Sequence, residues 1–300
     1  MDMTQNKCCR YGTNLRRRRR RCRKILRSII FSCSIIAVAV FVAVGSSMIR
    51  SGDGRTNKYD VEAGNNTYDN AVIENSKISE KNKIQNNQSM LDDIMNSTQY
   101  PKQLKDLALK NEEALEFVYD YPAEHVKEHT IDLTEEASMD SVPLFVQWDK
   151  RWGYEKYSGN FFAASGCGPT TLSMVVVYLT HNRDASPIAV AKYSKEAGYS
   201  VDGSGSSWTL ISEGCRHYGV KAKTVALDES RMKAELDEGH PIVVNVGPGD
   251  FTNTGHFMVI TGYDDEGFSI NDPNSIEKSG KRWLFRNISS QIRAVWSMYV

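Results

Sequence analysis

A run of 22 uncharged residues, from Ser28 to Ile49, constrains the fold of this chain more than any other feature. The run is long enough to cross a membrane, because about 20 helical residues at roughly 1.5 Å each span a hydrocarbon core of about 30 Å. Nine Arg and Lys residues lie directly before it, within positions 16–27. Burying the run in a soluble core would leave those cations beside apolar surface, which is costly. We therefore predict a transmembrane helix over residues 28–49.

A cleavable signal peptide is the alternative interpretation of this run. Residues 43–45 (Ala-Val-Gly) resemble a small-residue cleavage site, but a signal core usually has only about 7–15 apolar residues, so the length favours an uncleaved anchor. In both cases the positive-inside rule keeps the basic segment 1–27 in the cytoplasm. We expect the rest of the chain outside the cytoplasm, held at the cell membrane by one span, or secreted if the run is cleaved.

The zero net charge of the 300 residues hides an asymmetry between the ends of the chain. Residues 1–50 carry twelve Lys or Arg against one acid, a net charge of +11, so residues 51–300 carry −11. A basic block followed by an acidic body is typical of two parts that lie in different surroundings. We expect no nucleic-acid partner, because the acidic body excludes a uniformly basic nucleic-acid binder.

Composition divides the chain after the span into a tether, a linker and a globular domain. Residues 50–100 contain nine Asn, no Trp and no Phe, which predicts a disordered tether. Apolar residues recur at helical spacing before Pro122, so residues 101–138 are predicted to form an amphipathic helix and a charged linker. All five Trp lie at or beyond Trp148, and the globular domain is therefore expected over residues 139–300.

Local patterns in this domain predict an α+β fold. Cys167, Gly168 and Pro169 open the apolar run TTLSMVVVYL, which is typical of a buried helix with a Pro near its first turn. Strands are predicted at 241–246, 257–263 and 268–271, the last two joined by the turn sequence DDEG. A leading helix followed by hairpins favours a helix packed on an antiparallel sheet.

Cys167 is the strongest candidate for a nucleophile. A thiol at a helix N-terminus lies near free backbone N–H groups and the positive end of the helix dipole, which favour the thiolate. Gly166 and Gly168 on either side would let a bound carbonyl approach the backbone. A buried, inert cysteine is the alternative for Cys167, and we assign that role to Cys215, which has no such setting; a disulfide between the two cysteines would abolish the proposed chemistry.

A thiolate nucleophile needs a base and a group that orients the base. His256 opens one strand of the predicted hairpin, and Asp272 follows the return strand, with Asn271 as an adjacent candidate. Simple counting places Asp272 opposite Val259, three positions from His256. A bulge, a strong twist or side-chain reach must close that gap if Asp272 is to contact His256.

Three separated blocks resemble the double-glycine-leader, bacteriocin-processing peptidase-like family, known as peptidase family C39. The blocks are VPLFVQWDKRWG (142–153), SGCGPTTLSMV (165–175) and GHFMVITGYDDEGFSINDPN (255–274). The chain is more similar to the stand-alone C39-like domains of bacterial surface proteins, over roughly residues 100–300. The resemblance implies a papain-like fold with Cys167 as nucleophile, His256 as base, Asp272 as orienting acid and Gln147 as a donor to the oxyanion.

The chain also departs from the leader-processing members of that family. Those members sit on an ATP-driven exporter and face the cytoplasm, whereas this chain has no GxxxxGK[ST] loop and its predicted topology points the domain outward. The resemblance therefore supports the reaction type but not a leader-peptide substrate. We expect the substrate peptide beside Gly166, Gly168, Gly255 and Trp208.

The segment His125-Val-Lys-Glu-His129 matches the HxxEH pattern of some zinc peptidases. It lies in a charged, apolar-poor stretch without an apolar helix around it, so we interpret it as a solvated linker and expect no metal and no cofactor. The combined prediction is a membrane-anchored, outward-facing cysteine peptidase that acts on a peptide or protein. A transpeptidase or amidase with the same triad, or a catalytically silent peptide- or wall-binding module, is the alternative.

Overall fold

An antiparallel sheet of six strands forms the centre of the domain. The computed structural model describes the backbone of residues 66–300 and the side chains of residues 79–300. The strand order is β5-β10-β6-β7-β8-β9. The strands are β5 (Lys221–Thr224), β6 (Ile242–Val246), β7 (His256–Asp264), β8 (Gly267–Asn271), β9 (Arg282–Trp283) and β10 (Ile292–Tyr299). The hairpin predicted from residues 257–271 is thus present as β7 and β8.

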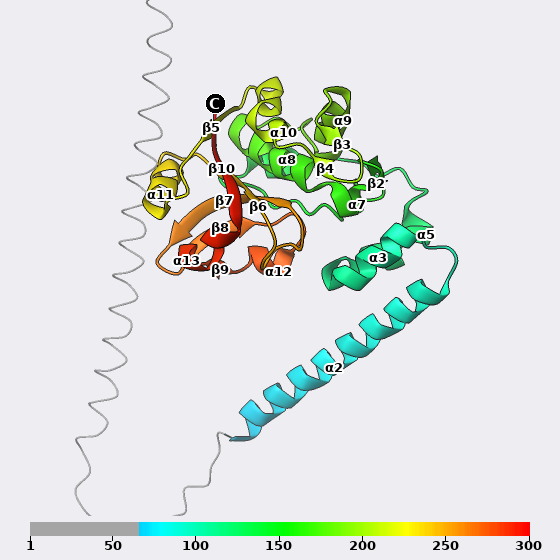
Figure 1. Cartoon of the computed structure of the whole chain (residues 1–300). Helices are drawn as coiled ribbons and strands as arrows, with labels where there is room; N and C mark the ends of the chain where they lie inside the picture. The colour runs from blue at the N-terminus through cyan, green and yellow to red at the C-terminus, as the bar shows by residue number, and fades with distance from the viewer. Residues whose placement is uncertain (1–65) are drawn as a thin grey trace, which may run out of the picture. The chain divides into compact units, whose positions relative to one another are not determined.

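Both faces of the sheet are covered, which explains the unbroken apolar sequence of β6. Val243 points into the same apolar cluster as α8 (Cys167–Thr180), whereas Val244 belongs to a second cluster on the other face. This second cluster includes Met232 of α11 (Glu229–Asp237) and Ile288 of α13 (Phe285–Ile288). Figure 1 shows α8 above β7 and β8. A strand buried on both faces needs apolar residues at every position rather than at alternate ones.

Short elements connect these layers and surround the N-terminus of α8. Before α8 lie β1 (Lys156–Tyr157), β2 (Asn160–Phe161) and α7 (Phe162–Ser165). After it lie α9 (Pro187–Glu196), β3 (Ser200–Val201), β4 (Gly205–Ser206), α10 (Thr209–Ser212) and the 3-10 helix η2 (Gly214–Tyr218). The remaining short helices near the C-terminus are α12 (Ile276–Ser279) and η3 (Ser289–Gln291). The arrangement confirms the predicted α+β class with a helix on an antiparallel sheet.

The tether predicted for residues 50–100 is wrong over residues 66–96, which form the helix α2 (Asn66–Asn96). No Gly or Pro interrupts this stretch. Its last turns carry Met90, Leu91 and Ile94, which pack against the helices that follow. A composition average over 50 residues hides three apolar side chains at helical spacing. Residues 50–65 lie outside the described residues.

The amphipathic helix predicted before Pro122 is broken into pieces. These are α3 (Lys102–Lys110), the 3-10 helix η1 (Glu112–Ala114) and α4 (Leu115–Tyr119), followed by α5 (Tyr121–Glu124) and α6 (Thr134–Ser138). Asn111 has extended backbone angles between α3 and η1, and its side chain accepts a hydrogen bond from the Glu113 N–H at 3.0 Å. Pro122 lies inside α5, at a first-turn position that tolerates proline.

None of the helices between residues 66 and 300 is long and apolar enough to cross a membrane. The basic segment 1–27 and the predicted span over residues 28–49 lie outside the described residues. The sheet with its helices belongs to one compact unit, Asn70–Val300.

Replacing Ile94 by Ala should test whether the end of α2 is part of the packed structure. Ile94 is fully buried, so we expect Ile94→Ala to lower the free energy of unfolding by about 2–4 kcal/mol. Ile84 of the same helix is 62% exposed, and Ile84→Ala should change it by less than about 0.5 kcal/mol. Denaturant unfolding of the two variants measures the difference. Equal, small effects would contradict the docking of α2.

Candidate active site

Cys167 is the first residue of α8 and is partly exposed. Gly166 occupies the N-cap, and the helix runs for 14 residues toward the core, with all of its middle buried. The backbone N–H groups of Gly168 and Phe257 both stabilise the charged form of the thiol. The sequence therefore places the thiol where a helix N-terminus and neighbouring donors favour the thiolate.

His256 is the first residue of β7 and pairs with Val246 of β6. Its imidazole Nε2 lies 2.7 Å from Oδ1 of Asp272, and both side chains are buried. This contact leaves Nδ1 free for the hydrogen bond with Cys167. The buried Asn245 donates a hydrogen bond from Nδ2 to the His256 carbonyl at 3.2 Å, which holds the start of the strand.

A β-bulge brings Asp272 toward His256. The pairing of β7 with β8 shifts between Ile260 and Gly262, so that Val259 lies opposite Asn271. Without the shift, Val259 would face Asp272, as simple counting of the hairpin predicts. The bulge moves Asp272 one position closer to His256, and the reach of the two side chains closes the remaining distance.

The structure distinguishes between the two candidate orienting residues. Asn271 donates hydrogen bonds from Nδ2 to the carbonyls of Val142 and Pro143, at 3.1 and 3.0 Å. It therefore ties β8 to the segment before Gln147. Asp272 is the residue in contact with His256, and its Oδ1 also accepts a hydrogen bond from the Asn274 N–H at 2.8 Å.

The electrostatics of the three side chains favour an ion pair between Cys167 and His256. Burial alone would raise the pKa of the Cys167 thiol, but the hydrogen bond with His256 and its positive charge lower it below the ordinary value. Burial alone would lower the pKa of His256, but the charge and hydrogen bond of Asp272, together with Cys167, raise it to about 10. A thiolate beside an imidazolium can attack an electrophilic carbon and then return a proton to the leaving group.

Gln147 lies beside the nucleophile and is buried. Its backbone N–H donates to the Pro273 carbonyl at 2.7 Å, and its side-chain Nε2 donates to the Ala163 carbonyl at 2.7 Å. An amide NH₂ carries two hydrogens, so one donor remains for a second acceptor. The predicted oxyanion donor is thus held by the loop after Asp272 and by α7, next to Cys167.

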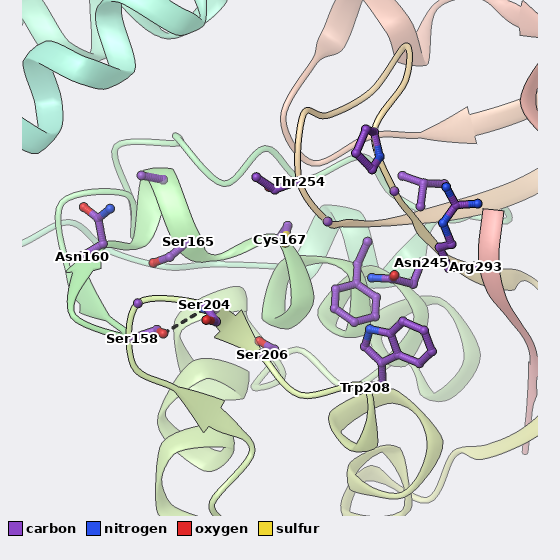
Figure 2. A pocket seen from close by; sticks show the side chains of 18 of the residues that line it. Ser158, Asn160, Ser165, Cys167, Ser204, Ser206, Trp208, Asn245, Thr254 and Arg293 are labelled. Carbon is purple, nitrogen blue, oxygen red and sulfur yellow. Dashed lines mark hydrogen bonds between the residues drawn. The ribbon is translucent and has the colours of Figure 1, made fainter. Parts of the chain in front are cut away.

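Cys167 lies between two cavities. The first, of about 720 Å³, is lined mainly by small polar residues and by Trp208, Asn245 and Arg293. Figure 2 shows Cys167 in this cavity with those three residues on one side and Ser158 and Ser204 on the other. The second, of about 640 Å³, is lined by Gln147 and His256 as well as by Cys167.

The four predicted substrate-binding residues divide into two groups. Gly255 lines both cavities, and Trp208 lines the first with 48% of its surface exposed. Gly166 and Gly168 line neither, and packing explains them: an added Cβ would lie 2.6 Å from the Phe162 ring at Gly166 and 2.5 Å from the Ser206 hydroxyl at Gly168. These two glycines let neighbouring segments approach the nucleophile closely.

The geometry supports neither a disulfide between Cys167 and Cys215 nor a zinc site at His125 and His129. Cys167 and Cys215 are both free thiols; Cys215 is buried, and burial raises its pKa to about 11. His125 stacks on Tyr121, with 4.1 Å between the ring centroids, and His129 contacts Glu124. No cluster of three or more His, Cys, Asp or Glu side chains suited to a metal occurs among the described residues.

Sequence reasoning missed the wall of the second cavity. That wall includes polar residues of α3, which the sequence shows only as the hydrophilic face of an amphipathic helix. It also missed Asn245, because one Asn in an apolar strand carries no signal of its partner. Both roles depend on tertiary contacts that no local pattern reveals.

The raised pKa of His256 leads to a test of Asp272. The protonated imidazole is stabilised in the folded protein, so in the native chain it should stay charged from below pH 6.5 until the pH approaches about 10. In Asp272→Asn the carboxylate charge is lost and burial favours the neutral ring, so the pKa should fall by several units. NMR titration of the His256 ring measures this change. Asn271→Ala is the control and should keep the raised pKa; an unchanged pKa in Asp272→Asn would contradict the assignment.

Comparison with known proteins supports a family assignment. The model of the Peptidase_C39 like family matches residues 139–300. No curated protein matches the sequence significantly. Among solved structures, the peptidase domain of ComA from Streptococcus, a bifunctional ABC transporter involved in quorum sensing, is 19% identical with a TM-score of 0.38, covering 53% of this chain and 96% of that domain. A C39-like peptidase from Bacillus anthracis is 17% identical with a TM-score of 0.33, covering 53% and 95%.

The family match covers more than half of the chain and contains Cys167, Gln147, His256 and Asp272. The match begins just before the segment that carries Gln147 and ends at Val300, directly after β10. The predicted domain limits of 139–300 coincide with it. The chain therefore belongs to the Peptidase_C39 like family and is a cysteine peptidase.

Proposed function

We propose that this protein is a membrane-anchored, extracytoplasmic cysteine peptidase that hydrolyses peptide bonds through Cys167, His256 and Asp272. The observation that carries the mechanism is the buried 2.7 Å contact between His256 Nε2 and Asp272 Oδ1. That contact directs the other imidazole nitrogen to a thiol at the N-terminus of α8. Cavities on both sides of Cys167 leave room for a peptide on either side of the scissile bond.

The reaction proceeds through an acyl-enzyme. The Cys167 thiolate attacks the peptide carbonyl carbon, and the backbone N–H of Cys167 and the remaining Nε2 hydrogen of Gln147 stabilise the oxyanion. The His256 imidazolium donates its proton to the leaving nitrogen, and the C–N bond breaks. The neutral imidazole then takes a proton from water as the water attacks the thioester, which releases the acid and restores the thiolate–imidazolium pair.

An amine in place of water would give transpeptidation by the same steps. The second cavity lies on the His256 side and is open to solvent, so it has room for an acceptor amine. A catalytically silent binding module fits less well, because Cys167, His256 and Gln147 line one cavity and Asp272 contacts His256. Hydrolysis needs only water and remains the reaction that we propose.

The membrane location rests on the sequence of residues 16–49. Nine cations followed by 22 uncharged residues favour one membrane span with the N-terminus in the cytoplasm. The peptidase domain, with residues 139–300, would then act outside the cytoplasm on a peptide or protein, or be released if the span is cleaved as a signal peptide.

Gln147→Ala separates stabilisation of the oxyanion from reactivity of the thiolate. Removing one oxyanion donor typically costs about 10²–10³-fold in kcat, whereas alkylation of the thiolate forms no oxyanion. We expect a loss of that size in the kcat/KM for a fluorogenic peptide, with an unchanged rate of Cys167 alkylation by iodoacetamide. Cys167→Ala should abolish turnover and keep the native circular dichroism spectrum. Full activity in either variant would contradict the mechanism.

A reporter fused after Val300 tests the topology. In the proposed orientation a periplasmic or surface-accessible alkaline phosphatase fusion is active, and a fluorescent protein that folds only in the cytoplasm is dark. Deleting residues 28–49 should move both fusions to the cytoplasm. A fluorescent fusion in the native chain would contradict the extracytoplasmic location.

A further inference from the structure

One polar face of α3 forms part of the active-site cleft, although α3 precedes the family domain. Gln103, Asp106, Leu107 and Lys110 line the second cavity together with Cys167 and His256. They occupy positions i, i+3, i+4 and i+7, which lie on one side of a helix. The adjoining apolar side of α3 packs with the end of α2 and with α4 through Leu104 and Ala108, and Leu107 belongs to both sides.

Hydrogen bonds fix this wall to the loop that carries Asp272. Asn111, directly after α3, donates from Nδ2 to the carbonyl and the Oδ1 of Asn274, at 3.0 and 3.1 Å. Glu113 accepts hydrogen bonds from the backbone N–H groups of Ile276 and Glu277, at 2.7 and 3.1 Å, and from the Ser275 hydroxyl. The α3 wall is therefore a fixed part of the cleft and not a neighbouring segment that lies there by chance.

The chemistry assigns this cavity to the leaving-group side of the substrate. His256 and Gln147 line the second cavity and are absent from the lining of the first. The general acid must lie within hydrogen-bond reach of the nitrogen that leaves. The residues C-terminal to the scissile bond should therefore run past His256 and along α3.

Charged side chains of both signs line this cavity. Asp106 forms an ion pair with Lys102 at 2.7 Å, and the nearby charge of Lys110 also lowers the pKa of Asp106. Asp250 accepts a hydrogen bond from the uncharged Gln291 amide at 2.6 Å. Lys110 of α3 and Lys278 of α12 line the same cavity, and neither forms an ion pair with a carboxylate in the part of the chain that the structure describes. Because neither lysine is held in a direct ion pair, both ammonium groups are available to attract an anionic group on the substrate.

We propose that the α3 face binds the part of the substrate C-terminal to the scissile bond, and that Lys110 with Lys278 selects a carboxylate there. The carboxylate belongs to an acidic side chain or to a nearby C-terminus of the peptide. This inference rests on the proposed peptidase function and adds a specificity-determining surface outside the family domain. It makes the segment 102–113 part of the enzyme's substrate site.

Paired fluorogenic peptides test the selection with the full chain. The peptides share every residue on the acyl side and carry Glu, Gln or Lys two positions after the scissile bond. Two further peptides have Gln at that position and end just beyond it, one in a free carboxylate and the other in an amide. We expect the native chain to prefer Glu over Lys by about two- to fivefold in kcat/KM, the scale of a solvent-accessible ion pair. The terminal pair shows whether a free C-terminus substitutes for the side chain.

Lys110→Glu should reverse the order of the Glu and Lys peptides, and Lys278→Glu should weaken the preference. Lys105→Glu is the matched control on the same helix, because Lys105 donates to the Met95 carbonyl and does not line the cavity. The control should keep the native order. The rate of deacylation should be equal in all variants, because the leaving group has departed before that step. Cys167 alkylation reports that each variant is folded.

The outcomes separate this inference from the proposed function. Cleavage of all peptides with the native order kept in Lys110→Glu would overturn the inference and leave the peptidase mechanism intact. A native chain without preference between the Glu and Lys peptides would do the same. A native chain that acylates none of the peptides, while Cys167 remains reactive to iodoacetamide, would contradict the peptidase function and this inference with it.

Discussion

The buried contact between His256 and Asp272 is the interaction on which the site depends. A carboxylate this deeply buried requires hydrogen bonds and a positive charge to offset the loss of hydration. Oδ1 of Asp272 accepts hydrogen bonds from the His256 ring and from the Asn274 N–H, and the backbone N–H of Asp272 donates to the Ser279 hydroxyl oxygen at 2.9 Å. The charged imidazole in turn stabilises the Cys167 thiolate. Loss of His256 would leave the buried Asp272 carboxylate and the Cys167 thiolate without a positive partner.

Packing brings the two halves of this site together. Cys167 comes from α8 and His256 from β7, and the two elements meet through one apolar cluster and through a hydrogen bond from the Thr171 hydroxyl to the Phe257 carbonyl at 3.1 Å. The sheet is buried on both faces, so β7 has little freedom to move relative to α8. The segment before the family domain extends this rigidity to the cleft, because Asn111 and Glu113 hold the loop after Asp272.

Local sequence predicts the elements of the site better than their assembly. The apolar run after Cys167 and the hairpin around the DDEG turn predict α8, β7 and β8, because each carries its own pattern of burial. The bulge at Ile260–Gly262 follows from tertiary fit, and counting along a regular hairpin places Asp272 one position too far. Gln147 was reached only through the family resemblance, since a Gln beside a Trp has no distinctive pattern. The docking of α2 and the cleft wall of α3 depend on contacts with distant residues and have no local signal.

The pH dependence of Cys167 alkylation in the full chain tests the central claim most directly. Mass spectrometry of the peptide that carries Cys167 would follow its reaction with iodoacetamide in the native chain and in His256→Ala. The ion pair predicts that Cys167 titrates well below the free-thiol pKa of about 8.5, and that the pKa rises in His256→Ala. The buried Cys215 should stay unreactive in both. A Cys167 that titrates as a free thiol, or whose pKa is the same without His256, would contradict the thiolate–imidazolium pair.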